Sequence, residues 1–311
     1  MPCAGHNGVM AHKHQGHAAA ARQEAVGEVA GHAKAAQNAA SDHDILHVQP
    51  DKFVPGAFVV AGGGVEHSFV DPNDPTHLEF PYMQRISEAI DVWVPAGERP
   101  RVIHVGGAGM SLARYVAFTR PTSPQIVLEP DVRLTDEVRR ELPLPQRSGI
   151  KVRPQDGRTG LAGMPADYAD MIIVDAFARL SVPGELVTAQ AFADYDRVLR
   201  EGGLLAINVT DSAPFAWTHR VLAGASRYFS AMSACAEPAV FKGRRMGNVV
   251  ILCAHLELPM SALMSRGRGD AFPYRWIFGD DLTRWRGAPE PFDDSAPQGS
   301  PVSRDARTHF E

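Results

Sequence analysis

The sequence has few cysteines and no long run of apolar residues. Its 311 residues include only three cysteines, Cys3, Cys235 and Cys253, and these form neither a Cys-x-x-Cys pair nor a plausible disulfide framework. This scarcity is typical of a reducing compartment, so we expect a cytoplasmic location. No apolar run approaches the roughly 18 residues that a membrane-spanning helix needs. Residues 1–40 also lack the apolar core of a signal peptide, so we expect no membrane partner.

An excess of basic residues is absent too. The net charge is −5 at pH 7, whereas nucleic-acid-binding domains usually carry basic patches and a high isoelectric point. We therefore expect no nucleic-acid partner. Hydrophobic residues make up 44% of the chain, which is ordinary for a globular protein with a core. The length allows one large domain, or one large domain and a small one.

The first 43 residues contain no aromatic side chain and few large aliphatic ones. Such a segment cannot bury enough apolar surface to offset its ordering entropy, so we expect a disordered tail rich in His and Ala. His12, His14 and His17 could hold a metal loosely, but no acid or thiol joins them at a fixed spacing, and we expect no metal site. Pro, Asp, Ser and Gly dominate residues 288–311, where we expect a second disordered tail.

The part of the chain between these tails has the pattern of an α/β protein. Short strands at about 45–48, 57–60 and 65–70 predict a small antiparallel β domain over residues 44–80. Residues 81–287 begin with a helix over 81–94, alternate strands and helices up to 209, and close with a strand hairpin over 230–253. This order predicts a Rossmann-like, seven-stranded methyltransferase-type sheet. We expect short helices over 258–287.

A glycine-rich turn, with Gly106, Gly107 and Gly109, separates the apolar run 102–105 from a predicted helix over 110–119. A buried strand, a glycine turn and a helix are typical of nucleotide-binding sheets, and glycine lets a ligand approach the backbone closely. A tight turn without a ligand is the alternative. No Lys or Arg stands between Gly106 and Ser111, which favours a nucleoside over a dinucleotide.

Acidic residues follow the next three predicted strands. Glu129 comes 23 residues after Gly106, close to the spacing at which a carboxylate accepts hydrogen bonds from ribose hydroxyls. Asp156 and Gly157 follow the strand that ends at residue 152, and Asp175 follows the strand 170–174. Because the carboxyl ends of parallel strands line one crevice, we expect these residues to share a site. Helix capping is the alternative for any one acid taken alone.

A dense polar segment, from Asp71 to Glu79, precedes the predicted helix 81–94. Capping explains an acid such as Asp74. It does not explain His77 and Glu79 together, so these two residues are candidates for the substrate site.

Taken in order, these elements resemble the spermidine synthase (polyamine aminopropyltransferase) family, particularly its spermidine-synthase-like branch in actinobacteria. The resemblance covers about residues 44–255. It implies a dimerising N-terminal β domain, and hence a homodimer. It also implies a catalytic domain that transfers the aminopropyl group of decarboxylated S-adenosylmethionine, the co-substrate, to a small-molecule amine in polyamine biosynthesis. Methylthioadenosine is the second product. Glu129 would then hold the ribose, Asp156 the adenine amino group, and Asp175 would act as general base.

The chain departs from the family pattern on the substrate side. The family's Gly-Gly-Gly-Asp-Gly-Gly turn reads Gly-Gly-Ala-Gly-Met-Ser here, so its acid falls on Gly109. The second acid of the Asp-Ser-Thr-Asp stretch is Ala178, and the family's substrate-side Tyr falls near His77. The segment 241–245 is basic and would repel a polycation, so the acceptor need not be putrescine.

Two alternatives follow from these departures. One is a methyltransferase that uses S-adenosylmethionine, with Arg114 or Arg244 as a partner for the donor's carboxylate. The other is a non-catalytic protein that binds methylthioadenosine or another adenosyl ligand.

Overall fold

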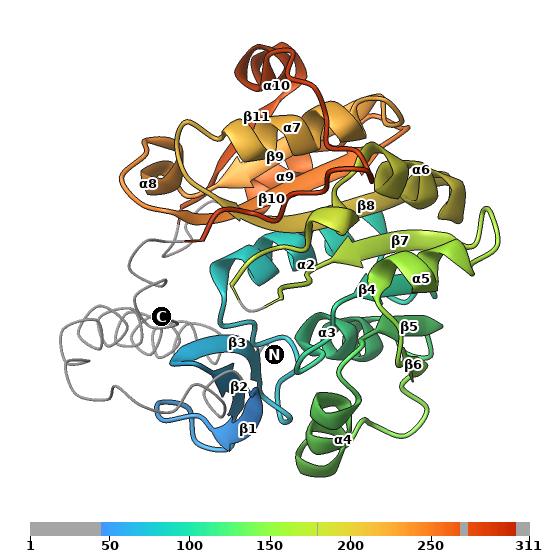
Figure 1. Cartoon of the computed structure of the whole chain (residues 1–311). Helices are drawn as coiled ribbons and strands as arrows, with labels where there is room; N and C mark the ends of the chain where they lie inside the picture. Colours follow the sequence, from blue (N-terminus) through green and yellow to red (C-terminus); the bar gives the residue numbers. More distant parts are fainter. Residues whose placement is uncertain (1–44, 179, 268–272, 303–311) are drawn as a thin grey trace, which may run out of the picture.

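The structure, a computed structural model, describes residues 45–178, 180–267 and 273–302 (Figure 1). The strands are β1 (His47–Pro50), β2 (Phe58–Gly62), β3 (Val65–Val70), β4 (Val102–Val105), β5 (Gln125–Leu128), β6 (Ile150–Arg153), β7 (Ala169–Val174), β8 (Leu199–Asp211), β9 (Ala231–Ala236), β10 (Gly247–Ala254) and β11 (Arg275–Phe278). The helices are α2 (Pro81–Trp93), α3 (Ser111–Thr119), α4 (Val132–Glu141), α5 (Gly157–Ala162), α6 (Ala189–Val198), α7 (Ala216–Ala225), α8 (Pro238–Phe241), α9 (Met260–Arg266) and α10 (Gly279–Arg286), with the 3₁₀ turn η1 (Gly184–Leu186).

The larger sheet has the strand order β11-β9-β10-β8-β7-β4-β5-β6. The strands from β4 to β8 are parallel, and β10 and β9 run antiparallel to their neighbours. This confirms the predicted methyltransferase-type sheet, in which the parallel strands direct their carboxyl ends to one edge. The eighth strand, β11, extends the sheet beyond β9.

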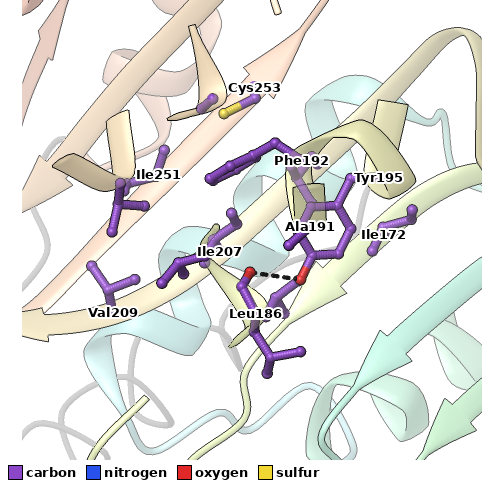
Figure 2. Packing of buried hydrophobic residues seen from close by; sticks show 14 of the residues in the cluster. Ile172, Leu186, Ala191, Phe192, Tyr195, Ile207, Val209, Ile251 and Cys253 are labelled. Carbon is purple, nitrogen blue, oxygen red and sulfur yellow. Dashed lines mark hydrogen bonds between the residues drawn. The ribbon is translucent and has the colours of Figure 1, made fainter. Parts of the chain in front are cut away.

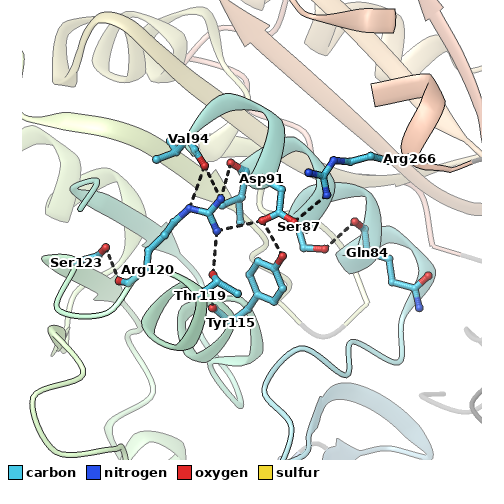
Figure 3. Close-up of polar contacts among 10 residues, drawn as sticks. Gln84, Ser87, Asp91, Val94, Tyr115, Thr119, Arg120, Ser123 and Arg266 are labelled. Carbon is cyan, nitrogen blue, oxygen red and sulfur yellow. Dashed lines mark hydrogen bonds and ion pairs between the residues drawn. The ribbon is translucent and has the colours of Figure 1, made fainter. Parts of the chain in front are cut away.

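Helices cover both faces of this sheet (Figure 1). Apolar side chains of α2, α3 and α9 pack on one face, and those of α5, α6, α7 and α10 pack on the other. Figure 2 shows the second of these layers, where Phe192 and Tyr195 are fully buried and the Tyr195 hydroxyl donates to the Leu186 carbonyl at 3.0 Å. On the first face, α2 and α3 are also joined by a polar network (Figure 3).

The centre of that network is Arg120, which is only 1% exposed. Its guanidinium donates to the backbone carbonyls of Ile90 and Val94 and pairs with Asp91 at 3.1 Å. Asp91 also pairs with Arg266 of α9 at 3.0 Å. A buried cation needs such partners to offset its desolvation, so this network fixes the end of α2 against α3 and α9.

The small sheet, β1-β2-β3, is antiparallel as predicted. A third apolar cluster joins it to the large sheet, because Val60 and Val70 pack with Met110 and Val127. A β-bulge interrupts the pairing of β2 with β3, since Val60 pairs with Ser68 while the next residue pairs with Glu66. The bulge leaves one residue of β3, His67, unpaired in the ladder.

Two predictions for the C-terminal region are wrong. Residues 258–287 are not all helical, because Arg275–Phe278 forms β11 and so places Trp276 on a strand. Residues 288–302 are not disordered: Phe292 is 1% exposed and packs against Trp217, with ring centroids 5.8 Å apart and the rings tilted by 43°. The composition of this polar segment gave no sign that Phe292 would be buried against another part of the chain.

The predicted histidine-rich tail, with His12, His14 and His17, lies outside the described residues, as do residues 303–311. The boundary between residues 80 and 81 stays a prediction. No helix in the described ranges is long and apolar enough to cross a membrane. The same ranges hold no group of three His, Cys, Asp or Glu side chains arranged to bind a metal ion.

Candidate active site

A cavity of about 420 Å³ opens at the carboxyl edge of the parallel strands. Its wall is formed by β3, the glycine turn, the ends of β4, β5 and β7, and the start of α5. Five acidic residues line it: Glu129, Asp131, Asp156, Asp175 and Glu185. Of the described residues that line the cavity, none is Lys or Arg. The cavity therefore favours a cationic ligand.

The glycine turn packs tightly against the end of β7. Gly106 has φ +85°, and a Cβ atom there would lie 2.4 Å from the Asp175 carbonyl oxygen. At Gly107 a Cβ atom would lie 2.7 Å from Val127. Only glycine satisfies the left-handed backbone and the close approach at Gly106. Gly106 and Gly107 both line the cavity, as the sequence predicts.

Glu129 organises the glycine turn. Its Oε2 atom accepts from the backbone N–H groups of Gly107 at 3.0 Å and Ala108 at 3.3 Å. Its Oε1 atom accepts from the backbone N–H of Asp131 at 3.0 Å. These bonds hold the carboxylate at the cavity wall beside the end of β5. A carboxylate oxygen has two acceptor sites, so Oε2 is fully used by the turn and Oε1 can still accept one hydrogen bond from a ligand.

Gly109 does not line the cavity. Its N–H donates to the Ser68 hydroxyl at 3.1 Å, and a Cβ atom there would lie 2.9 Å from both Ser68 and Val70. The Ser111 hydroxyl donates to the Phe69 carbonyl at 2.6 Å. This part of the turn therefore holds β3 against the large sheet, which is a different role from the ligand contact that the sequence predicts for Gly109.

Asp156 and Gly157 lie where the sequence predicts, at the cavity edge. Asp156 caps α5: its Oδ1 atom accepts from the Thr159 N–H at 2.9 Å, and this bond lowers the pKa of the carboxyl. Gly157 allows α5 to approach the sheet, since a Cβ atom would lie 2.4 Å from Val105. Capping thus fixes the Asp156 carboxylate at the start of α5, beside the cavity.

Asp175 is held by two neutral donors. The Tyr82 hydroxyl donates to its Oδ2 atom at 3.1 Å, and the Asn208 amide donates to its Oδ1 atom at 2.9 Å. Removal from water raises the pKa of Asp175, and the two hydrogen bonds partly oppose this rise. Burial and the nearby Asp175 raise the pKa of Tyr82 well above its usual value, so its hydroxyl stays protonated. Asp175 is thus a fixed carboxylate with strengthened basicity.

His77 and Glu79 lie together but outside the cavity wall. His77 Nε2 lies 3.2 Å from Glu79 Oε2, and His77 Nδ1 lies 3.5 Å from Asp71 Oδ2. The hydrogen bond with Glu79 is the main cause that raises the pKa of His77. The tyrosine beside Asp175 is Tyr82, in the first turn of α2, and sequence reasoning did not pick it out.

Sequence reasoning missed two histidines that line the cavity, His67 and His104. Burial lowers the pKa of His67, and no described residue forms a hydrogen bond with its ring. Burial lowers the pKa of His104 to about 4, and its Nε2 atom lies 2.8 Å from Gln125 Oε1. Both imidazoles are therefore neutral at pH 7. His104 could have been noticed because it interrupts the apolar run 102–105. No sequence signal marks His67, because it lies at the β-bulge between β2 and β3.

The arginines suggested for a donor carboxylate do not line the cavity either. The Arg114 guanidinium donates to the backbone carbonyls of Gly109, Leu142 and Pro143. Arg244 is exposed in the segment between α8 and β10. A carboxylate in this cavity would therefore have no cationic side chain from either arginine.

Solved structures share this architecture. A probable spermidine synthase from Corynebacterium glutamicum gives a TM-score of 0.76 at 24% identity, covering 86% of this chain and 99% of that protein. The chain has the spermidine synthase fold. A spermidine synthase in complex with the transition-state analogue AdoDATO gives 0.52 at 14% identity, covering 80% and 84% of the two chains. Human methyltransferase-like protein 13 in complex with SAH gives 0.50 at 18% identity, covering 70% and 96%. No protein-family profile and no curated protein matches the sequence.

Proposed function

We propose that this chain is an aminopropyltransferase that moves the aminopropyl group of decarboxylated S-adenosylmethionine to an amine, with Asp175 as the general base. The observation that carries this proposal is the fixed, poorly solvated Asp175 carboxylate at the cavity wall, bonded to Tyr82 and Asn208. An amine is protonated near pH 7 and must lose a proton before it attacks. A carboxylate with a raised pKa is a better base than an ordinary one.

The reaction follows from this arrangement. The amine nitrogen bonds to the aminopropyl carbon while the carbon–sulfur bond breaks, and the sulfur keeps the electron pair as methylthioadenosine leaves. Asp175 takes the proton from the amine. The cavity holds both reactants and so lowers the entropic part of the barrier. In this proposal Glu129 accepts from the ribose hydroxyls and Asp156 from the adenine amino group, and both acids line the cavity.

The charge of the cavity supports the decarboxylated donor. A sulfonium cation with an ammonium tail suits a wall whose described residues include five acids and neither Lys nor Arg. Intact S-adenosylmethionine brings a carboxylate, which would face acids such as Glu129 and Asp175 and would meet no Lys or Arg among the described lining residues. Ala178 and Gly109 stand where the family pattern has acids, so fewer carboxylates are available to a polycationic acceptor, which favours acceptors other than putrescine.

A thermal-shift titration tests the proposal with four probes: decarboxylated S-adenosylmethionine, S-adenosylmethionine, methylthioadenosine and S-adenosylhomocysteine. A ligand at 100 times its Kd adds about 2.7 kcal/mol of stability. We expect the decarboxylated donor and methylthioadenosine to bind more tightly, followed by methylthioadenosine release when amines are added. Preference for the carboxylated pair would indicate methyl transfer. Ligand binding without product from a panel of amines would indicate a non-catalytic adenosyl-binding protein.

A further inference from the structure

The C-terminal strap, residues 288–302, runs from α10 across the molecule toward the active-site edge (Figure 1, dark red). Phe292 anchors it, because the Ala189 N–H donates to the Phe292 carbonyl at 2.8 Å. Further along, the Trp217 indole N–H donates to the Gln298 carbonyl at 2.8 Å. The strap is thus fixed to α6 and α7 before it reaches the loop that follows β7.

Ser300 joins the strap to that loop. Its N–H donates to the Val182 carbonyl at 3.1 Å, and its hydroxyl oxygen accepts from the Val182 N–H at 2.9 Å. The Ser181 hydroxyl donates to the Ser300 carbonyl at 2.8 Å. Ser300 is only 5% exposed, so water cannot readily replace these bonds.

The strap and the loop also touch at a glycine. At Gly184 a Cβ atom would lie 2.5 Å from the backbone nitrogen of Gln298. The backbone of Gly184 itself is not left-handed, so the close approach of the strap is the reason for glycine at this position. Any larger side chain would push the strap and the loop apart.

The same loop forms a wall of the cavity. Pro183, Glu185 and Leu186 line it. Leu186 also packs against Gly157 of α5, since a Cβ atom on Gly157 would lie 2.8 Å from Leu186. Residues 181–188 therefore contact the strap and also form part of the ligand site.

We propose that the C-terminal strap holds this wall in its ligand-binding position, and that Ser300 is the positioning residue at the contact. The strap then binds cooperatively with the adenosyl ligand: an intact contact strengthens ligand binding, and by thermodynamic reciprocity the ligand stabilises the contact. The coupling to an adenosyl ligand rests on the proposed function, whereas the positioning of the loop by the strap does not.

Hydrogen–deuterium exchange and calorimetry of the full chain test this with three variants and a control. Ser300→Ala removes the acceptor of Val182, Ser300→Thr keeps a hydroxyl, and Gly184→Ala forces the strap away. Gly163→Ala is the control, because its Cβ atom would meet nothing closer than 3.7 Å. Without ligand, we expect Ser300→Ala and Gly184→Ala to speed exchange at the Val182 amide at least tenfold, with no change at the Val127 amide in the sheet.

Calorimetry uses methylthioadenosine as the probe. We expect Kd to rise about tenfold in Ser300→Ala and Gly184→Ala, within the usual range of coupling between sites, and to stay near wild type in Ser300→Thr and Gly163→Ala. In wild type, methylthioadenosine should also slow exchange at the Ser300 amide, which lies outside the cavity wall.

The exchange and calorimetry measurements each test a separate claim of the proposal. Unchanged exchange at Val182 in both disrupting variants would refute the positioning role. Faster exchange with unchanged Kd would refute the coupling. If wild type binds no adenosyl compound, the proposed function and the coupling both fail, and the exchange data without ligand still decide whether the strap positions the loop.

Discussion

Replacing Asp175 with asparagine separates its proposed role as general base from its part in the stability of the fold. Asparagine has the same shape, keeps one carbonyl oxygen and carries no charge. Because removal from water raises the pKa of Asp175, the folded state disfavours the charged form, and a neutral amide relieves that cost. Against this, either Tyr82 or Asn208 loses its acceptor, at about 1 kcal/mol. The free energy of unfolding should therefore stay within about 1 kcal/mol of wild type.

Turnover should behave very differently in Asp175→Asn. General base catalysis contributes roughly 10²–10⁴ in rate, so kcat/KM should fall by about that factor, which corresponds to about 2.7–5.5 kcal/mol of transition-state free energy. The assay is methylthioadenosine release from decarboxylated S-adenosylmethionine and an amine acceptor, followed by chromatography. The Kd of methylthioadenosine should change less than about threefold, because the product carries no amine for Asp175 to deprotonate.

Asp170→Asn is the matched control, since it makes the same chemical change at the start of the same strand. Asp170 pairs with Arg200 and accepts from the Arg101 N–H, far from the cavity wall. It should keep full turnover. Unchanged turnover in Asp175→Asn, or loss of methylthioadenosine binding together with a large loss of stability, would refute the role of Asp175 as base.

Three further variants test the residues around the cavity. Tyr82→Phe removes a donor that lowers the pKa of Asp175, so the acid limb of the kcat/KM profile should move to higher pH; an unmoved limb would contradict this. His104 has a pKa of about 4 in the folded state and 6.5 when unfolded, so its share of stability is complete above pH 6.5 and falls toward pH 4. Urea unfolding should show about 2–3 kcal/mol less acid-induced destabilisation between pH 7 and pH 4.5 in His104→Gln; an equal pH dependence would contradict it. His67→Leu should keep the stability of wild type, because the imidazole has no hydrogen bond with a described residue, and should weaken methylthioadenosine binding measured by calorimetry; unchanged affinity would exclude His67 from the ligand site.

The sheet and the main acids of the cavity could be predicted from sequence because both follow from local pattern and topology. Apolar runs mark the buried parallel strands, and the carboxyl ends of such strands must meet at one edge. Glu129 and Asp175 directly follow β5 and β7, and Asp156 stands three residues after β6, so the topology brings all three to one cavity. Their position needed no information about packing, whereas the raised pKa of Asp175 depends on its burial.

The remaining site residues depend on contacts between distant segments. Tyr82 reaches Asp175 only because α2 packs on that face of the sheet, and His67 lines the cavity beside a bulge whose register no sequence pattern reveals. Phe292 is buried between elements that lie more than 60 residues earlier in the chain. A polar composition predicts disorder correctly only where no such pocket exists.

The small sheet explains why the glycine turn lacks an acid at Gly109. A side chain there would have to pass Ser68 and Val70, each 2.9 Å from the position of a Cβ atom. β3 therefore occupies the space that an acidic side chain on this turn would need, and the Gly109–Ser68 and Ser111–Phe69 hydrogen bonds hold it there. An acid at this position cannot be added without moving β3. In the proposed reaction, the ammonium tail of the donor must consequently be recognised by groups on other elements, and Asp175, directly after β7, is an acid of the cavity wall that lies outside the turn.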